Sequence, residues 1–312
     1  MFWNSKKSFV DVHVCITGGS EGLGLALAQQ FVQESANVSI IARTASKLEI
    51  AVQALKECCK EFPTTSKIMW SSADVTKPES VQEAINTVRE KFGPIDVLIC
   101  CAGVSQPGRF LELDLDAFKA QMDVNYIGTV TTVKAVVPEM VERRLGEVVI
   151  IASALAVIGL AGYSAYSPSK WALRGFADSL RMELQAYDVG VSIAYPPDMT
   201  TPGYERELKL TPPEVLAMHN AVGDKAFAPE RVAELILSGL KKGVYHLPTP
   251  DFLQTLSQST MASLSPYPFF LPFQMCIAGL VVPVSTFITG WFDRIVKRHL
   301  LEAKTESSKK GQ

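Results

Sequence analysis

The chain has 312 residues, of which 47% are apolar and 20% are charged. This composition suits one large α/β domain, and a net charge of −2 excludes an overall nucleic-acid footprint. Six cysteines without a CxxC pair and four histidines without ligand spacing predict reduced thiols and no metal site. Residues 1–9 are too short and too charged for a signal peptide or membrane span, so we expect a short lead before a cytosolic domain.

Over residues 10–250, short β-rich runs alternate with longer helical patterns. This alternation predicts one domain with the α/β Rossmann fold, a doubly wound parallel sheet of about seven strands. The clearest strand patterns are VHVCIT, NVSIIA, KIMWSSA, IDVLICCAG, EVVIIAS and VSIAYP. Residues 198–228 interrupt the rhythm after a late strand, at the position where ligands bind such sheets. We expect a lid there, with a plain surface excursion as the alternative.

A glycine-rich motif, TGGSEGLG at residues 17–24, follows the first strand and opens a helix. Its glycines Gly18, Gly22 and Gly24 permit a tight turn and a close approach of the backbone to phosphate. The free N–H groups of the helix that follows favour a pyrophosphate. The motif therefore predicts a dinucleotide site, although an ordinary strand-to-helix turn can carry the same spacing.

The residues at the end of the second strand indicate whether the cofactor is NADH or NADPH. An NAD-preferring enzyme usually has an acid there, whereas this chain has Arg43 and then Lys47. A guanidinium pairs with a 2′-phosphate, so we expect NADPH as the cofactor; a solvated charge pair is the alternative. Asp74, at the end of the third strand, can accept a hydrogen bond from the adenine amino group or cap the next helix.

A catalytic set is predicted from one helix and the two elements before it. Tyr166 and Lys170 are four residues apart, which places them on one helical face. Ser153 ends a strand, and Asn125 lies in an earlier helix. Tyr163 is expected only to pack.

Reducing a ketone requires a proton for the developing alkoxide, and a free tyrosine has a pKa of about 10. We expect the Lys170 ammonium to lower the pKa of Tyr166, the proton donor, and to hold the nicotinamide ribose. Ser153 is expected to orient the carbonyl oxygen, and Asn125 to position water for proton resupply.

These motifs, together with CCAG at residues 100–103, resemble the short-chain dehydrogenase/reductase family in order and spacing. The resemblance implies Ser153, Tyr166 and Lys170 as the catalytic triad and Asn125 as its fourth member. The family usually has NNAG or NAG where this chain has CCAG, so the amide that steadies the central strand is missing. Members tend to form dimers or tetramers through the helices carrying Asn125 and Tyr166. The resemblance therefore allows a homo-oligomer and leaves the oligomeric state open.

A closer resemblance is to the 3-ketodihydrosphingosine reductases of that family. It rests on AYPPDMTTPGY, AYSPSKWALRGFADSLRMEL and FDRIVKRH. It implies reduction of 3-dehydrosphinganine, a long-chain keto-amine lipid, to sphinganine in sphingolipid synthesis. The cofactor contacts assigned on these grounds are Gly18, Ser20, Glu21, Gly22, Gly24, Arg43, Lys47, Asp74, Tyr166, Lys170 and Thr201. An acid among Asp198, Glu205 and Glu207 is expected to meet the substrate ammonium.

The chain carries no charged residue between Asp251 and Asp293. We expect residues 251–293 to associate with a membrane, as a hairpin or at the interface; a buried oligomer surface is the alternative. Residues 294–312 are expected to form a basic and polar cytosolic tail. The terminal KKGQ resembles a retrieval signal of the endoplasmic reticulum, which predicts attachment to that membrane with the catalytic domain facing the cytosol.

Two other functions remain open from the residues alone. The catalytic set serves any ketone or secondary alcohol, so another membrane-bound family member acting on a steroid, a retinoid or an acyl ketone is one alternative. A non-catalytic NADPH-binding scaffold is the other, although an intact Ser153, Tyr166 and Lys170 argue against it.

Overall fold

The structure is a computed structural model. It describes residues 8–62, 64–222 and 226–251, together with residues 290–291, 294–295, 298–299 and 302.

Seven parallel strands form one sheet in this part of the chain, in the order β3-β2-β1-β4-β5-β6-β7. The predicted doubly wound α/β fold is therefore confirmed, and each of the six strand patterns lies in a strand. The strands are β1 (His13–Thr17), β2 (Asn37–Ala42), β3 (Ile68–Ser72), β4 (Val97–Cys100), β5 (Gly146–Ile151), β6 (Val189–Ala194) and β7 (His246–Leu247).

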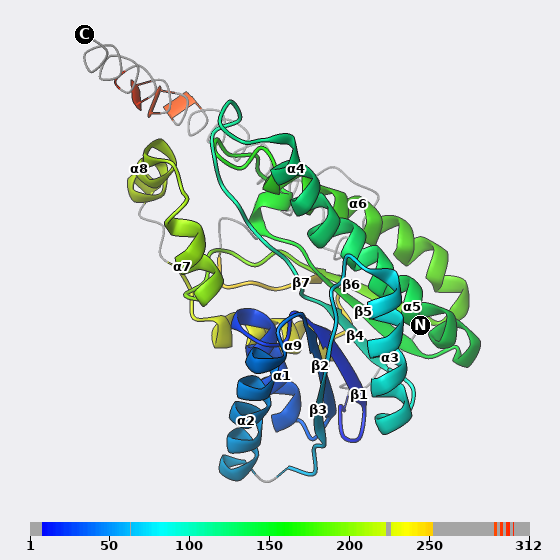
Figure 1. The fold of residues 1–312 in the computed structure, drawn as a ribbon. Coiled ribbons are helices and arrows are strands. Elements are labelled where there is room, and N and C mark those ends of the chain that lie inside the picture. The colour runs from blue at the N-terminus through cyan, green and yellow to red at the C-terminus, as the bar shows by residue number, and fades with distance from the viewer. Residues whose placement is uncertain are drawn as a thin grey trace.

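Helices cover both faces of the sheet (Figure 1). One face packs against α1 (Gly22–Gln33), α2 (Ala45–Glu61) and α9 (Pro229–Lys241). The other packs against α3 (Pro78–Phe92), α5 (Gly128–Arg143) and α6 (Tyr166–Leu184). The shorter helices are α4 (Leu115–Met122), α7 (Pro202–Leu208) and α8 (Pro213–Val222).

The apolar character of the strands follows from this sandwich. In β1, Val14 and Ile16 enter the core beneath α1, while Cys15 between them enters the core beneath α3 and α5. Successive side chains of a strand point to opposite faces, so a strand that is covered on both faces is apolar throughout. The same burial explains why these strands show no alternation of apolar and polar residues.

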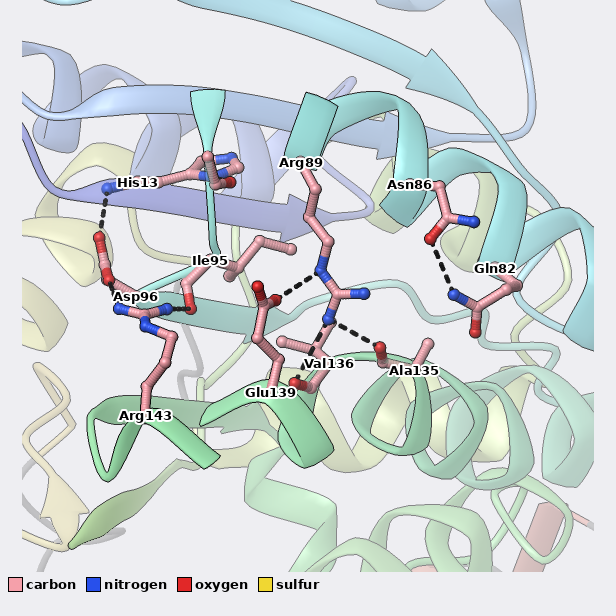
Figure 2. A network of polar contacts seen from close by, with 11 residues as sticks. His13, Gln82, Asn86, Arg89, Ile95, Asp96, Ala135, Val136, Glu139 and Arg143 are labelled. Atoms are coloured by element: carbon pink, nitrogen blue, oxygen red, sulfur yellow. Dashed lines mark hydrogen bonds and ion pairs between the residues drawn. The ribbon is translucent and has the colours of Figure 1, made fainter. Parts of the chain in front are cut away.

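A polar network ties the amino-terminal edge of the sheet to the helices (Figure 2). The Arg89 side chain forms an ion pair with Glu139 at 2.7 Å and donates to the carbonyl oxygen of Ala135 at 3.0 Å, which joins α3 to α5. Asp96 forms an ion pair with Arg143 and accepts the backbone N–H of His13 at 3.0 Å. Each of these charges therefore has an opposite charge beside it.

The segment after β6 forms two helices, α7 and α8, at the carboxyl edge of the sheet (Figure 1). Within residues 198–228, Pro202 and Pro213 each begin a helix, where the missing N–H costs nothing. Their position agrees with the expected lid.

In the part of the chain that the structure describes, no helix is long and apolar enough to cross a membrane. The predicted membrane-associating segment, residues 251–293, lies almost entirely outside the described residues, and so does most of the predicted tail at 294–312.

Candidate active site

The order of strands reverses between β1 and β4, whose connections leave toward opposite faces of the sheet. In doubly wound folds ligands bind outside the carboxyl ends of the strands at such a point. The glycine-rich turn follows β1 here, and the CCAG segment follows β4. The predicted cofactor motif is thus at the expected crevice.

The glycine-rich turn requires its glycines. Gly18 has a φ of +69°, and a β-carbon there would lie 2.8 Å from the backbone of Ala102. A β-carbon on Gly24 would lie 2.2 Å from the carbonyl oxygen of Gly18. Both contacts are too short for any side chain, so the backbone of the turn stays bare beside the amino terminus of α1. These features fit a bound pyrophosphate.

The amide missing from CCAG has a partial substitute. The hydroxyl oxygen of Thr17 accepts the backbone N–H groups of Cys101 at 3.2 Å and Ala102 at 3.4 Å. Thr17 also donates to the carbonyl oxygen of Ile99 at 3.4 Å. The end of β4 is therefore steadied by a hydroxyl from the neighbouring strand.

A carboxylate at the start of α1 forms ion pairs with two positively charged side chains. Glu21 forms ion pairs with Lys47 of α2, at 2.6 Å, and with Arg206 of α7. Lys47 is thus close to the turn, as predicted, but its ammonium is paired with protein. Ser20 is half-buried in the same turn. Arg206 was not anticipated, because nothing in the sequence links α7 to the turn.

Arg43 follows β2 and is exposed, and the Ser72 hydroxyl donates to its carbonyl oxygen at 3.0 Å. Asp74 accepts from both the backbone and the hydroxyl of Thr76, at 3.0 and 2.8 Å. The residue that caps α3 is Lys77, so the alternative of Asp74 as helix cap is wrong. Its carboxylate instead shapes the turn before that helix.

The three residues of the predicted triad come together. Ser153 follows β5, where its hydroxyl accepts the backbone N–H of Leu155 at 3.1 Å and lies within hydrogen-bonding reach of the Tyr166 phenol. Tyr166 is the first residue of α6, and the Lys170 ammonium lies 5.8 Å from the centre of its ring. Lys170 is 5% exposed and donates to the carbonyl oxygen of Ile151 at 3.1 Å.

Asn125 lies in a π-helical turn, Asp123–Ile127, between α4 and α5. Its side-chain amide accepts from the N–H of Val104 at 2.8 Å and donates to the carbonyl of Val104 at 3.0 Å. It also donates to the Ser169 hydroxyl at 2.8 Å. Asn125 therefore joins the segment after β4 to α6, through the backbone of Val104 and the side chain of Ser169.

The electrostatics of Tyr166 differ from the sequence prediction. Burial, followed by the charge of Glu207, raises the pKa of the phenol, whereas the hydrogen bond from Ser153 lowers it. Burial also lowers the pKa of Lys170 to about 8. The expected net lowering of the Tyr166 pKa is thus wrong for the protein alone, because burial of the phenol outweighs the influence of a neighbouring positive charge. The Tyr166 phenol is therefore held in its neutral, protonated form.

The segment after β6 places two acids near the Tyr166 phenol. The Tyr163 hydroxyl donates to Glu207 of α7 at 2.8 Å, and the rings of Tyr163 and Tyr166 are 6.2 Å apart. The prediction that Tyr163 only packs is therefore wrong. Asp198 lies 3.9 Å from His219 and also raises the pKa of Tyr166. Thr201 caps α7 and lies over the glycine-rich turn, since a β-carbon on Gly22 would be 3.1 Å from its methyl group.

A small apolar cluster packs beside Tyr166. The buried members are Tyr163, Val215 and Met218, against which Leu155, Leu160, Tyr166 and Ile295 pack. Ile295 follows the long uncharged stretch in the sequence, so a described residue of the carboxyl-terminal region reaches the lid. Sequence patterns could not reveal this contact, because it joins segments far apart in the chain.

Comparison with known proteins agrees with this arrangement. The short chain dehydrogenase family matches residues 12–209. The 3-dehydrosphinganine reductase of Danio rerio is 38% identical, over 93% of this chain and 87% of the relative. The 3-ketodihydrosphingosine reductase of Bos taurus is 37% identical, over 95% and 89%.

Solved structures share the fold. Levodione reductase superposes with a TM-score of 0.68 at 24% identity, covering 75% of this chain and 91% of that one. An alcohol dehydrogenase from Thermococcus sibiricus, in complex with 5-hydroxy-NADP, gives 0.63 at 24% identity, covering 77% and 92%. With the fold, the bare glycine turn and the triad in place, the chain belongs to the short chain dehydrogenase family and is an oxidoreductase that binds a nicotinamide cofactor and acts on a ketone.

Proposed function

We propose that the chain reduces the ketone of 3-dehydrosphinganine to the alcohol of sphinganine, with NADPH, at the cytosolic face of the endoplasmic reticulum membrane. The substrate assignment is supported by relatives named for this reaction in animals and in Dictyostelium discoideum, which are 36% to 39% identical. The observation that carries the chemistry is Lys170, a buried ammonium below a phenol, with Ser153 beside that phenol.

The residues of the chain divide the work of carbonyl reduction. A bound nicotinamide supplies the hydride. Ser153 donates to the carbonyl oxygen and fixes its position beside Tyr166, which gives that oxygen its proton. Lys170 stabilises the phenolate that remains, and Asn125 holds the segment after β4 in place through its two hydrogen bonds to the backbone of Val104.

The substrate is tested by following NADPH oxidation and product formation with purified full-length protein. We expect turnover of 3-dehydrosphinganine in detergent or lipid vesicles, and kcat/KM at least about 100-fold lower for steroid and retinoid ketones. Equal or better turnover of a steroid or retinoid ketone would assign the chain to another branch of the family.

The preference for NADPH rests on Arg43 and Lys47 after β2, where an NAD-preferring enzyme carries an acid. Arg43 is exposed and bears no ion pair among the described residues, so its guanidinium is available to a 2′-phosphate. Arg43→Asp should raise the KM for NADPH far more than that for NADH. Lys67→Asp, another exposed cation before β3, is the matched control; equal changes in both KM values for Arg43→Asp would refute the assignment.

The membrane proposal rests on the uncharged run between Asp251 and Asp293 and on the exposed apolar side chains of Phe110 and Leu111, 67% and 93% accessible. In sealed microsomes, added protease should reach tags at both ends of the chain. A protected carboxyl-terminal tag would overturn the proposed topology.

A further inference from the structure

One acid of the lid is turned toward the catalytic residues. Glu207 of α7 accepts the Tyr163 hydroxyl at 2.8 Å, and the Tyr163 ring lies 6.2 Å from that of Tyr166. Glu205, two residues earlier on the same helix, is exposed. A separation of two residues turns a helical side chain to a different face, so only Glu207 lies against the catalytic residues.

The surroundings of Glu207 suit a cation that comes from elsewhere. No lysine or arginine among the described residues forms an ion pair with it. Burial and the nearby charge of Asp198 raise the pKa of its carboxyl group, while the hydrogen bond from Tyr163 lowers it. A second acid, Asp198, thus adds to the negative potential, and a bound cation would relieve the repulsion.

The proposed substrate carries such a cation at the required place. In 3-dehydrosphinganine the ammonium is on the carbon next to the ketone, so it lies about 3 Å from the carbonyl oxygen. When that oxygen accepts from Ser153 and Tyr166, the ammonium must lie within the shell of residues around Tyr166. Glu207 is an acid in that shell, connected to Tyr166 through the ring of Tyr163.

We infer that Glu207, held by Tyr163, binds the ammonium of the substrate and makes the enzyme selective for 2-amino ketones. This inference rests on the proposed function. The sequence left three candidate acids for the substrate ammonium: Asp198, Glu205 and Glu207. The structure favours Glu207 as the residue that determines specificity. Asp198 lies 3.9 Å from His219 and acts on Glu207 through its negative charge.

The experiment compares two substrates in three forms of the full-length protein. The substrates are 3-dehydrosphinganine and the same long-chain ketone without the amine. Glu207→Gln keeps an acceptor for Tyr163 and removes the charge, and Glu205→Gln removes an exposed charge from the same helix. We expect Glu207→Gln to lower the ratio of kcat/KM for the amino ketone to kcat/KM for the other ketone by about 10- to 100-fold, mainly through the KM of the amino ketone. A change in the pKa of Tyr166 acts on both ketones alike and cancels in this ratio. Glu205→Gln should leave the ratio unchanged.

An equal loss on both ketones in Glu207→Gln would overturn the inference, since the residue would then support the lid or the chemistry in general. An unchanged preference for the amine would overturn it as well. Melting temperature and NADPH binding confirm that the variant is folded, and Tyr163→Phe provides a second variant, expected to weaken the amine preference by less. If the wild-type protein does not reduce the amino ketone, the proposed function is wrong. If the wild-type protein does reduce it and Glu207→Gln keeps the preference for the amine, the proposed function stands and only the role of Glu207 is wrong.

Discussion

Charged side chains at the amino-terminal edge of the sheet and those at the predicted catalytic site differ in whether they form ion pairs. At the amino-terminal edge, Arg89 and Asp96 each lie beside an opposite charge (Figure 2). At the carboxyl edge, Lys170 donates to a backbone carbonyl and Glu207 accepts from a phenol, and neither forms an ion pair among the described residues. Paired charges stabilise the fold, whereas buried unpaired charges have shifted pKa values and mark the site of chemistry.

Lys170→Met gives the sharpest test of this contrast. Removing the ammonium should lower kcat by about 100- to 10,000-fold, because the phenolate formed on proton transfer loses its stabilising charge. Thermal unfolding should occur at the same or a higher temperature, because the folded protein no longer buries a charge that burial disfavours. A steep fall in melting temperature that parallels the lost activity would show that Lys170 serves the fold instead.

Arg89→Met should have the opposite outcome. The variant loses an ion pair and hydrogen bonds to backbone carbonyls of α5, so the free energy of unfolding should fall by about 1.5 to 3 kcal/mol. Because the network is at the far edge of the sheet, kcat/KM should stay within about twofold. Lys60→Met removes an exposed pair with Glu57 and serves as control, in which we expect no measurable change in stability. Denaturant unfolding measures the stability, and steady-state kinetics measure the activity. If Arg89→Met lost activity at unchanged stability, the amino-terminal network would serve catalysis and the contrast between the two sets of charges would be wrong.

The pH dependence of ketone reduction should follow the protonation of the Lys170 side chain. Burial lowers its pKa to about 8, so the ammonium is present below that pH and is lost above it. The pKa of Tyr166 is raised, so the phenol keeps its proton across the same range. We expect kcat/KM to fall about tenfold per pH unit above the Lys170 pKa, measured from about pH 6 to about pH 9.5. A flat profile to the upper limit would contradict the assignment.

Arg206→Gln should have the smallest effect. Its ion pair with Glu21 connects the lid to the glycine-rich turn, but the Arg206 side chain is 57% exposed. Exposed pairs contribute about 0.2 to 1 kcal/mol, so the KM for NADPH should rise by about two- to fivefold with little change in kcat. Arg231→Gln on α9, which removes an exposed pair with Glu234, should change nothing. A collapse of kcat in Arg206→Gln would mean that the lid depends on this pair.

Much of this arrangement follows from local patterns. The strands, the glycine turn and the relation of Tyr166 to Lys170 depend on residues close in sequence, and all are found as predicted. No helix was predicted within residues 198–228, where α7 and α8 form, because those residues interrupt the alternation of strand and helix patterns.

The role of Tyr163 and the pKa of Tyr166 were mispredicted for a different reason. Both depend on Glu207, which is far away in the chain, and on burial, which no motif encodes. The partners of Lys47 and Asn125 also depend on tertiary contacts. Sequence patterns therefore located the site, and the surroundings of its charges needed the fold.

The most direct test of the account is NADPH oxidation by Tyr166→Phe with 3-dehydrosphinganine as substrate. The phenyl ring keeps the packing and removes the proton donor, and Tyr187→Phe, at an exposed tyrosine, is the control. We predict a loss of about 100- to 10,000-fold in kcat with NADPH binding retained, and no change in the control. A Tyr166→Phe variant that reduces the ketone at the wild-type rate would contradict the account.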